Sequence, residues 1–251
     1  IVITQPAAVT ELMVSNISSF GFELTWATPV GNESLLTYEI LINGVPNIHA
    51  YVIDNCATVF GLIANTLYNV VVRAINDSGT AESTPIDVLT YPNIVTESNV
   101  TDITQTTLVI SWIAPTGGTA PLVYSILRDD QPYTSVTITD TTAQVTDLQP
   151  NTQYLFSIKA DNGSGSSQSS YIITMTLPDA ATNLQASNIA TDSCTLTWLP
   201  PSGTETLTYT IYKNDSIYPA DIYGASANIQ GLASNTTHSF KIKADNDSGH
   251  S

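Results

Sequence analysis

Apolar and polar residues alternate in three short segments of the chain, and each segment ends in a tryptophan. This alternation places every second side chain on one face, which is typical of a β-strand with one buried face. The three segments are Phe22-Leu24-Trp26, Leu108-Ile110-Trp112 and Cys194-Leu196-Trp198. Each tryptophan is followed by a proline three residues later and a glycine five residues later, which predicts a turn after each strand.

A second alternating segment follows an Asn-Thr pair in three places. Its apolar faces are Tyr68-Val70-Val72-Ala74, Tyr154-Phe156-Ile158-Ala160 and His238-Phe240-Ile242-Ala244. Its other faces carry the basic residues Arg73, Lys159, Lys241 and Lys243. We therefore expect the apolar faces to be core. The basic faces are open to two interpretations, a solvated strand surface or a stripe that binds an acidic partner.

The two patterns recur together, so the chain is a tandem repeat. The tryptophans at positions 26, 112 and 198 are 86 residues apart each time. Short strands with frequent turn residues, and the lack of any convincing helical period, indicate an all-β protein. A chain of 251 residues has room for three sandwiches at this spacing.

The residues around these strands resemble those of fibronectin type III domains over essentially the whole chain. The resemblance rests on the early tryptophan, on the tyrosine of the next strand, and on Leu-x-x-Asn-Thr-x-Tyr leading into a strand that ends Ala-x-Asn-x-x-Gly. It implies three tandem immunoglobulin-like β-sandwiches. It also implies core roles for Trp26, Trp112 and Trp198, and a tyrosine corner at Tyr68 and Tyr154. The third repeat has His238 at the corner position, so the resemblance does not decide whether this corner forms its hydrogen bond.

Prolines mark the repeat boundaries. Pro92 and Pro178 close the first two repeats, and the same spacing reaches back to Pro6. Residues 1–6 therefore correspond to the closing strand of a preceding repeat, or to a donor strand formed by Ile1, Val2, Ile3 and Thr4. We expect repeats at 7–92, 93–178 and 179–251, the third without its last strand. Three explanations are open: the chain is a piece of a longer array, Ile1–Thr4 of one copy fills the open edge of the next, or the last strand is disordered.

Composition and net charge limit the classes of partner that we expect for this chain. The chain has 22 acidic and 6 basic residues, for a net charge of −16. This charge disfavours nucleic acid and anionic membrane surfaces. No apolar run approaches the roughly 20 residues that span a bilayer, so we expect no membrane insertion. Of the two cysteines, Cys194 is predicted to be buried like an apolar residue, whereas the sequence assigns no role to Cys56.

No catalytic constellation is apparent. The histidines share no motif, and neither a Gly-x-Ser-x-Gly elbow nor a phosphate loop occurs. We expect no enzyme activity, no cofactor and no metal. The nearest approach to a calcium loop is Asp245-Asn246-Asp247-Ser248-Gly249, which lacks the glutamate that an EF-hand needs.

Eight Asn-x-Ser/Thr sequences are candidate N-glycosylation sites. They lie at Asn16, Asn32, Asn76, Asn99, Asn162, Asn214, Asn235 and Asn246. Three of them recur at the same loop, where the asparagine also has a turn-forming role.

The leading functional hypothesis is an extracellular structural protein, a repeat unit of a rod, stalk or filament. Its expected partners are copies of itself or further repeats, with a protein or glycan ligand as an option. A first alternative is a cell-surface adhesin or receptor ectodomain that binds through loops such as 32–36 and 116–121. A second alternative is a set of spacer repeats in a secreted polysaccharide hydrolase.

Overall fold

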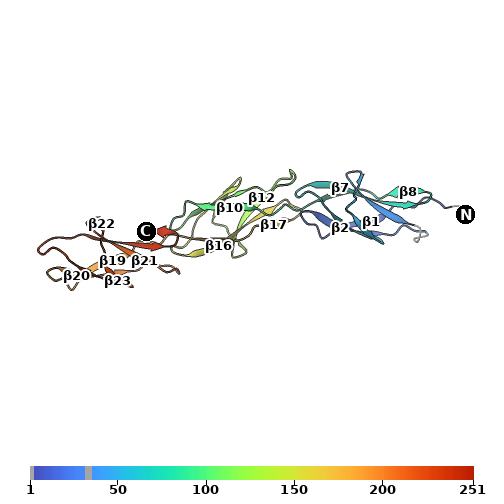
Figure 1. The fold of residues 1–251 in the computed structure, drawn as a ribbon. Helices are drawn as coiled ribbons and strands as arrows, with labels where there is room; N and C mark the ends of the chain where they lie inside the picture. Colours follow the sequence, from blue (N-terminus) through green and yellow to red (C-terminus); the bar gives the residue numbers. More distant parts are fainter. Residues whose placement is uncertain (1–2, 32–35) are drawn as a thin grey trace. The chain divides into compact units, whose positions relative to one another are not determined.

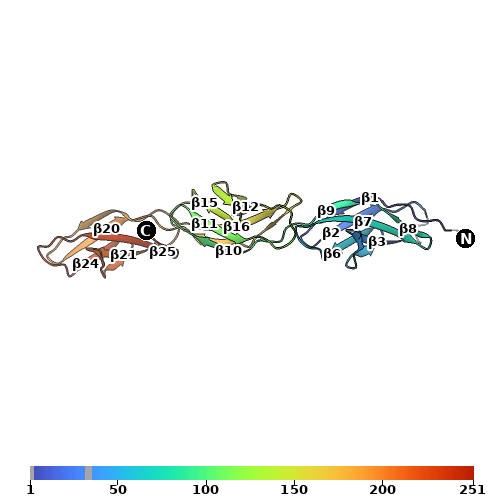
Figure 2. The same cartoon turned by 90° about the horizontal axis from the view of Figure 1, so that it is seen from above.

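A computed structural model describes residues 3–31 and 36–251, and these residues form β-strands without any helix. Figures 1 and 2 show the strands from two directions. The all-β fold is therefore confirmed. Ile1, Val2 and Asn32, which were singled out in the sequence, lie outside the described residues.

The first repeat is a sandwich of two antiparallel sheets. One sheet has the order β1-β2-β6-β5, and the other has the order β4-β3-β7-β8, with β9 also pairing with β7. The strands are β1 (Thr10–Ser15), β2 (Gly21–Ala27), β3 (Thr37–Ile42), β4 (Val45–Pro46), β5 (Tyr51–Ile53), β6 (Cys56–Phe60), β7 (Leu67–Asn76), β8 (Gly79–Glu82) and β9 (Ile86–Leu89).

The second repeat has the same two sets of strands. One sheet has the order β10-β11-β15-β14, and the other contains β12, β13, β16, β17 and β18. The strands are β10 (Thr96–Thr101), β11 (Leu108–Ile113), β12 (Val123–Arg128), β13 (Gln131–Pro132), β14 (Val136–Thr139), β15 (Thr142–Val145), β16 (Gln153–Asp161), β17 (Ser166–Gln168) and β18 (Ile172–Met175).

The third repeat also has two antiparallel sheets, ordered β19-β20-β24-β23 and β22-β21-β25-β26. The strands are β19 (Thr182–Ser187), β20 (Ser193–Leu199), β21 (Thr208–Lys213), β22 (Ser216–Ile217), β23 (Asp221–Tyr223), β24 (Ser226–Gln230), β25 (Phe240–Asn246) and β26 (Gly249–His250). Among the described residues, no strand occupies the place beside β25 that β9 and β18 take in the other repeats.

The start of β25 differs from the strand predicted from the sequence pattern. The alternation placed His238 on this strand, but β25 begins at Phe240, two residues later. In β7, the first residues pair with β9 from Leu67↔Leu89 to Val70↔Ile86. In the third repeat these pairing positions have no partner strand among the described residues, and the backbone before Phe240 is not extended into a ladder.

Apolar alternation fills the cores as expected. In the first repeat Phe22, Leu24 and Trp26 are at most 3% exposed, and Val70 and Val72 on the facing sheet are fully buried. Trp26 meets Tyr38 edge to face at 5.2 Å between ring centroids, and Trp198 meets Tyr209 in the same way at 5.1 Å. Such pairs add to the free energy gained by burying the rings. Cys194, at the position of Phe22, is 6% exposed.

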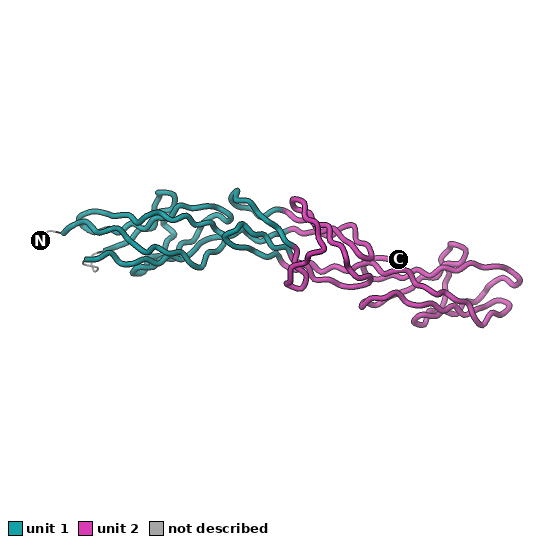
Figure 3. The backbone as a smooth tube through the Cα atoms, turned by 180° about the vertical axis from the view of Figure 1, so that it is seen from behind, with its two compact units in different colours: residues 1–96, 114–125, 158–169 teal, residues 97–113, 126–157, 170–251 magenta. Residues whose placement is uncertain are grey.

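Contacts divide the described chain into two compact units, coloured in Figure 3. The first unit has residues 1–96, 114–125 and 158–169, and the second has residues 97–113, 126–157 and 170–251. The first unit thus contains the first repeat together with two segments of the second repeat, one that runs into β12 and one that holds the end of β16 and all of β17. The second unit contains the third repeat and the rest of the second.

Candidate functional site at the joints between repeats

The turn between β16 and β17 contacts the end of the first repeat, within the first unit. Asn162 Nδ2 donates hydrogen bonds to Asn65 Oδ1 at 2.9 Å and to the Thr90 carbonyl at 2.8 Å. Its Oδ1 accepts from the backbone N–H groups of Ser164 and Gly165 at 3.2 and 3.3 Å. Both hydrogens and the oxygen of the Asn162 amide are therefore engaged.

Asn65 is the partner of Asn162 and is only 4% exposed. Its backbone has φ of 52°, a left-handed conformation that asparagine tolerates better than most residues. Its Nδ2 donates to the carbonyls of Ala120 at 2.7 Å and Gly118 at 3.3 Å. Its backbone N–H donates to the Tyr91 carbonyl at 3.0 Å. A single buried side chain thus connects the strand end of the first repeat to a loop of the second.

Thr90 holds the closing segment of the first repeat against the same region. Its side chain is fully buried, and its hydroxyl donates to the Ile63 carbonyl at 2.8 Å. The hydroxyl also accepts from the Thr66 N–H at 3.0 Å. We call the contacts of Asn65 and Thr90 with Gly118, Ala120 and Asn162 joint 1.

The same contacts recur in the second unit between the second and third repeats. Asn246 Nδ2 donates to Asn151 Oδ1 and to the Thr176 carbonyl, both at 2.9 Å. Asn151 is 1% exposed and donates to the Glu205 carbonyl at 2.8 Å. The buried Thr176 hydroxyl donates to the Gln149 carbonyl at 2.7 Å. We call this set, with Thr204, joint 2.

Half of the same arrangement is present at each of two further places. Asn76, at the position of Asn162, donates to the Thr4 carbonyl at 2.9 Å. Asn235, at the position of Asn65, is exposed, and no hydrogen bond of its side chain is found among the described residues. Ile3 and Thr4 are not in a strand, and Thr4 is exposed, whereas its equivalents Thr90 and Thr176 are fully buried.

Glycine permits the close approach at joint 1. A Cβ on Gly118 would lie 2.4 Å from the Asn65 carbonyl oxygen and 2.3 Å from Thr66 Oγ1. The backbone N–H of Gly118 donates to the Ala64 carbonyl at 2.7 Å. The loop 116–121, proposed above as a ligand contact, is therefore occupied by joint 1.

The tyrosine corner is formed in the first two repeats. The hydroxyl of Tyr68 accepts from the Ile63 N–H at 2.8 Å, and that of Tyr154 accepts from the Gln149 N–H at 2.7 Å. His238 instead places Nε2 at 3.3 Å from the Ala233 carbonyl, and its Nδ1 is buried without a hydrogen-bond partner among the described residues.

The three tryptophans that mark the repeats are all buried. Trp26, Trp112 and Trp198 are 3%, 5% and 6% exposed.

Acidic neighbours neutralise much of the basic face. Arg73 bonds to Glu82 at 2.7 Å and to Glu39 at 2.9 Å. The hydrogen bond with Glu82, together with the negative charge of both carboxylates, holds the pKa of Arg73 above its ordinary value. Lys243 lies 3.1 Å from Asp245. These pairs favour a solvated strand surface over a binding stripe.

The candidate N-glycosylation asparagines fall into two structural groups. Asn76, Asn162 and Asn246 use Nδ2 as a donor in the contacts above, and a glycan on Nδ2 would replace one of these hydrogens. The exposed ones among the described residues are Asn16, Asn99, Asn214 and Asn235. Of these, Asn16 donates to Glu23 at 2.6 Å, and Asn214 accepts from the Ser239 N–H at 3.0 Å.

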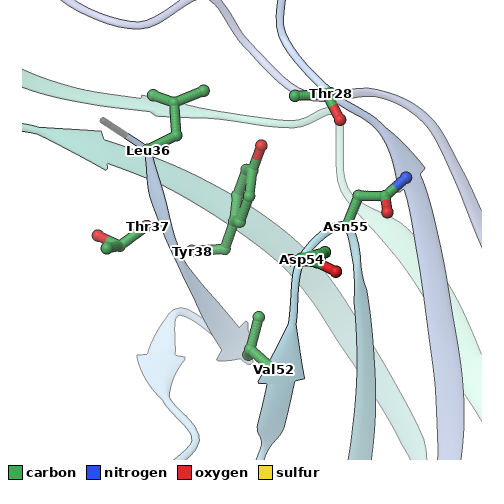
Figure 4. A pocket seen from close by; sticks show the side chains of 7 residues that line it. All are labelled: Thr28, Leu36, Thr37, Tyr38, Val52, Asp54 and Asn55. Carbon is green, nitrogen blue, oxygen red and sulfur yellow. The ribbon is translucent and has the colours of Figure 1, made fainter. Parts of the chain in front are cut away.

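The described residues also form a hollow of about 480 Å³ in the first repeat, shown in Figure 4. It is lined by Thr28, Leu36, Thr37, Tyr38, Val52, Asp54 and Asn55. The lining has one carboxylate and no imidazole or thiol, and Asn55 Nδ2 already donates to the Trp26 carbonyl at 2.8 Å. Within residues 3–31 and 36–251, no three His, Cys, Asp or Glu side chains gather into a metal site.

The two cysteines differ in environment. Cys194 is buried, and this burial raises the pKa of its thiol. Cys56 is exposed at the start of β6, where its Sγ lies 3.1 Å from the Ile53 carbonyl. Both thiols are free.

Sequence reasoning did not identify the joint residues. Asn65 and Asn151 were seen only as part of a repeated Asn-Thr pair, and the threonines two residues before Pro92 and Pro178 were not singled out. A usable signal existed, because an asparagine and a threonine recur at fixed distances from the repeat boundary. Turn formation at an exposed loop does not by itself explain why both an asparagine and a threonine recur at these positions.

Known proteins resemble this chain over most of its length. The family model described as "Fibronectin type III domain" matches residues 7–88, 93–176 and 179–251. Receptor-type tyrosine-protein phosphatase eta of Gallus gallus is 28% identical over 257 residues, which cover 96% of this chain and 18% of that protein. Chitinase A1 of Niallia circulans is 29% identical over 197 residues, which cover 74% of this chain and 27% of that protein. The chain thus spans only a small part of these relatives.

Among solved structures, a two-domain fibronectin type III segment from chicken tenascin is 20% identical. The match covers 67% of this chain and 99% of the tenascin segment, with a TM-score of 0.43. In the part of this chain that the structure describes, no helix is long and apolar enough to span a membrane.

Proposed function

Because the chain belongs to the fibronectin type III family, we propose that it serves as a non-enzymatic structural segment of an extracellular rod, stalk or filament. The observation that carries this proposal is the recurrence of one hydrogen-bonded arrangement at joints 1 and 2. In both joints a turn asparagine bonds a buried asparagine and the carbonyl of a buried threonine.

The energetics of these contacts favour fixed joints over loose linkers. Asn65 and Asn151 are nearly inaccessible to water, so breaking their bonds leaves buried polar groups unsatisfied. Each such group costs about 1–3 kcal/mol. A joint with two or three of these bonds therefore resists opening, and resistance to bending is what a rod needs from its joints.

The experiment measures whether successive repeats tumble together. We expect ¹⁵N relaxation of the full chain to give one shared anisotropic diffusion tensor for the first two repeats. In the Asn65→Ala/Asn162→Ala double variant, the first repeat should tumble faster and separately, because joint 1 has lost its central bonds. Asn99→Ala, which changes an exposed asparagine of β10, is the matched control and should behave like the unaltered chain.

Two outcomes would contradict the proposal. If the first two repeats of the unaltered chain already tumble independently, the joints do not hold them. If the double variant retains the shared tensor, the asparagine contacts do not determine the joint.

Spacer repeats of a secreted polysaccharide hydrolase are a second candidate function, favoured by the similarity to chitinase A1. Fixed joints would suit a spacer as well. The two candidates predict different domains next to these repeats, so the open reading frame of the natural gene decides between them. A catalytic domain encoded beside these repeats would support the spacer. The adhesin alternative has less support, because joint 1 occupies the loop 116–121.

A further inference from the structure

The chain has two Asn-Gly pairs, and one of them lies in joint 1. They are Asn43-Gly44 in the turn after β3 and Asn162-Gly163 in the turn between β16 and β17. In such a pair the glycine backbone nitrogen can attack the side-chain amide carbon of the asparagine, because glycine has no side chain to hinder the approach. Asparagine before glycine is therefore more reactive in water than asparagine before a larger residue.

The reaction is deamidation, and it replaces the side-chain amide with a carboxylate. The nitrogen of Gly163 forms a bond to Asn162 Cγ while the bond from Cγ to Nδ2 breaks. The proton of the glycine N–H leaves with Nδ2 as ammonia, and a succinimide ring remains. Water then opens this ring, so that position 162 becomes an aspartate or an isoaspartate.

The closed joint 1 holds the reacting groups away from this reaction. The Asn162 amide is fixed by the four hydrogen bonds described above, two from Nδ2 and two to Oδ1. The backbone N–H of Gly163 donates to Asp161 Oδ1 at 2.8 Å. Ring closure has to turn the amide and redirect this N–H, so it breaks these hydrogen bonds first. The reaction therefore proceeds from the open joint, at a rate set by how often joint 1 opens.

The product does not fit the closed joint. Its carboxylate has no amide hydrogens, so it would face two acceptors, Asn65 Oδ1 and the Thr90 carbonyl. Asn65 is 4% exposed, and turning its amide would not help, because its Nδ2 already donates to the carbonyls of Gly118 and Ala120. A negative charge against buried acceptors is unfavourable. Isoaspartate also carries a carboxylate, on a lengthened backbone.

Joint 2 lacks the reactive pair. Its turn asparagine, Asn246, is followed by Asp247, and the equivalent Asn76 of the first repeat is followed by Asp77. The three turns have the same length, but Gly163 has φ of 85°, whereas neither aspartate has a positive φ. The side chain of an aspartate hinders the attack of its own backbone nitrogen. Of the two joints, only joint 1 therefore contains an asparagine that reacts readily.

We propose that Asn162 is a deamidation site and that its reaction opens joint 1 permanently while joint 2 stays closed. The inference rests on the proposed function in one respect, since it takes joint 1 to be a contact that holds two repeats together. It goes further because it gives joint 1 a finite lifetime in water. A rod built from this segment gains a flexible connection at joint 1 as it ages.

The first test follows the reaction in the full chain, kept in mildly alkaline buffer at body temperature. Peptide mapping by mass spectrometry measures conversion at Asn162, with Asn43 as the reference site in the same chain. Asn65→Gly removes one bond partner of Asn162, and glycine tolerates the φ of 52° at this position. Conversion at Asn162 should rise about tenfold in this variant, equivalent to a joint weakened by about 1.4 kcal/mol, with Asn43 unchanged. Gly163→Asp, which copies the sequence of joint 2, should suppress conversion at Asn162.

The second test measures what the product does to the joint. Asn162→Asp introduces the carboxylate directly, and ¹⁵N relaxation should then show the first repeat tumbling separately from the second. Asn99→Asp adds the same charge at an exposed position of β10. It is the matched control and should keep the shared diffusion tensor of the unaltered chain.

Four results would overturn the inference. Asn162 could stay intact in Asn65→Gly while a free peptide of residues 159–166 converts, or conversion could be equally fast with and without Asn65→Gly. Conversion could also be as fast in Gly163→Asp, or Asn162→Asp could keep the shared tensor. Each of these results is compatible with an unaltered chain that tumbles as one body, so the proposed function would stand. Independent tumbling of the unaltered chain before incubation would instead contradict the proposed function itself, and the inference with it.

Discussion

Buried polar side chains at single positions hold the ends of these sandwiches together. Tyr154 is an example, because its hydroxyl accepts the Gln149 N–H at 2.7 Å while the ring packs against Phe156 with centroids 5.7 Å apart. Tyr154→Phe keeps the ring and removes only this acceptor. We expect it to lower the free energy of unfolding by about 1 kcal/mol. Urea unfolding measures this change, with Tyr51→Phe, at a position 64% exposed, as the control. Equal stability of the two variants would contradict a stabilising role for the corner bond.

At the same scale, the sequence predicted apolar positions better than polar ones. The alternation around Trp26 and Val70 identified core residues, because burial of a large apolar side chain requires little beyond the right face of a strand. Asn65 and Thr90 could not be assigned in this way. Their burial depends on partners 53 to 97 residues away for Asn65 and on Thr66 and Ile63 for Thr90. A pattern along one strand carries no information about such partners.

At the scale of the element, the loop that follows β11 is shaped to approach the first repeat. Gly118→Ala would place a Cβ within 2.4 Å of the Asn65 backbone oxygen, and a backbone atom cannot yield as a flexible side chain can. We expect this change to open joint 1 while each sandwich stays folded. The substitution changes the intrinsic exchange rate of the amide at position 118, so exchange is measured at the Asn65 amide, which donates to the Tyr91 carbonyl. Its rate should rise about tenfold, for a loss of about 1.4 kcal/mol.

Joint 2 offers a matched control for that change. Thr204 occupies the position of Gly118 in the third repeat and already carries a Cβ, and its N–H donates to the Asn151 carbonyl at 3.0 Å. Thr204→Ala should therefore leave the amide of Asn151 as protected as before. If exchange at the Asn65 amide were unchanged in Gly118→Ala, joint 1 would tolerate a side chain at position 118, and the expectation from the short Cβ distance would be wrong.

Elements were predicted well wherever both sheet partners are present in the chain. The segment after Asn151 forms β16 from Gln153, in agreement with its alternation, and β18 pairs with its first four residues. The corresponding segment after Asn235 has the same apolar face, yet β25 starts only at Phe240. Periodicity reports which face is apolar, whereas strand formation also needs a neighbour to bond the backbone.

For the molecule as a whole, this difference predicts unequal stability among the three repeats. Backbone groups that lack a ladder partner exchange through small local openings, whereas those in the centre of a sheet exchange only through larger ones. In dilute solution, the amides of His238 and Phe240 should therefore exchange at least about 100-fold faster than those of Tyr154 and Phe156, a difference of about 2.8 kcal/mol in protection.

The amide of Lys241 serves as the internal control for that comparison. Lys241 pairs with Tyr212 of β21, and the bond from the Asn214 N–H to the Ser239 carbonyl shows that the backbone groups of alternate residues from Ser239 onward face β21. If the third repeat were merely unfolded, Lys241 would exchange as fast as His238, and the fast exchange would report global instability. If His238 and Phe240 were as protected as their equivalents in β16, the edge would not be open. Protection confined to Lys241 and the other amides that face β21 is the result that an open outer edge requires, since the apolar core around Leu196, Trp198 and Ile211 still holds the strand in place.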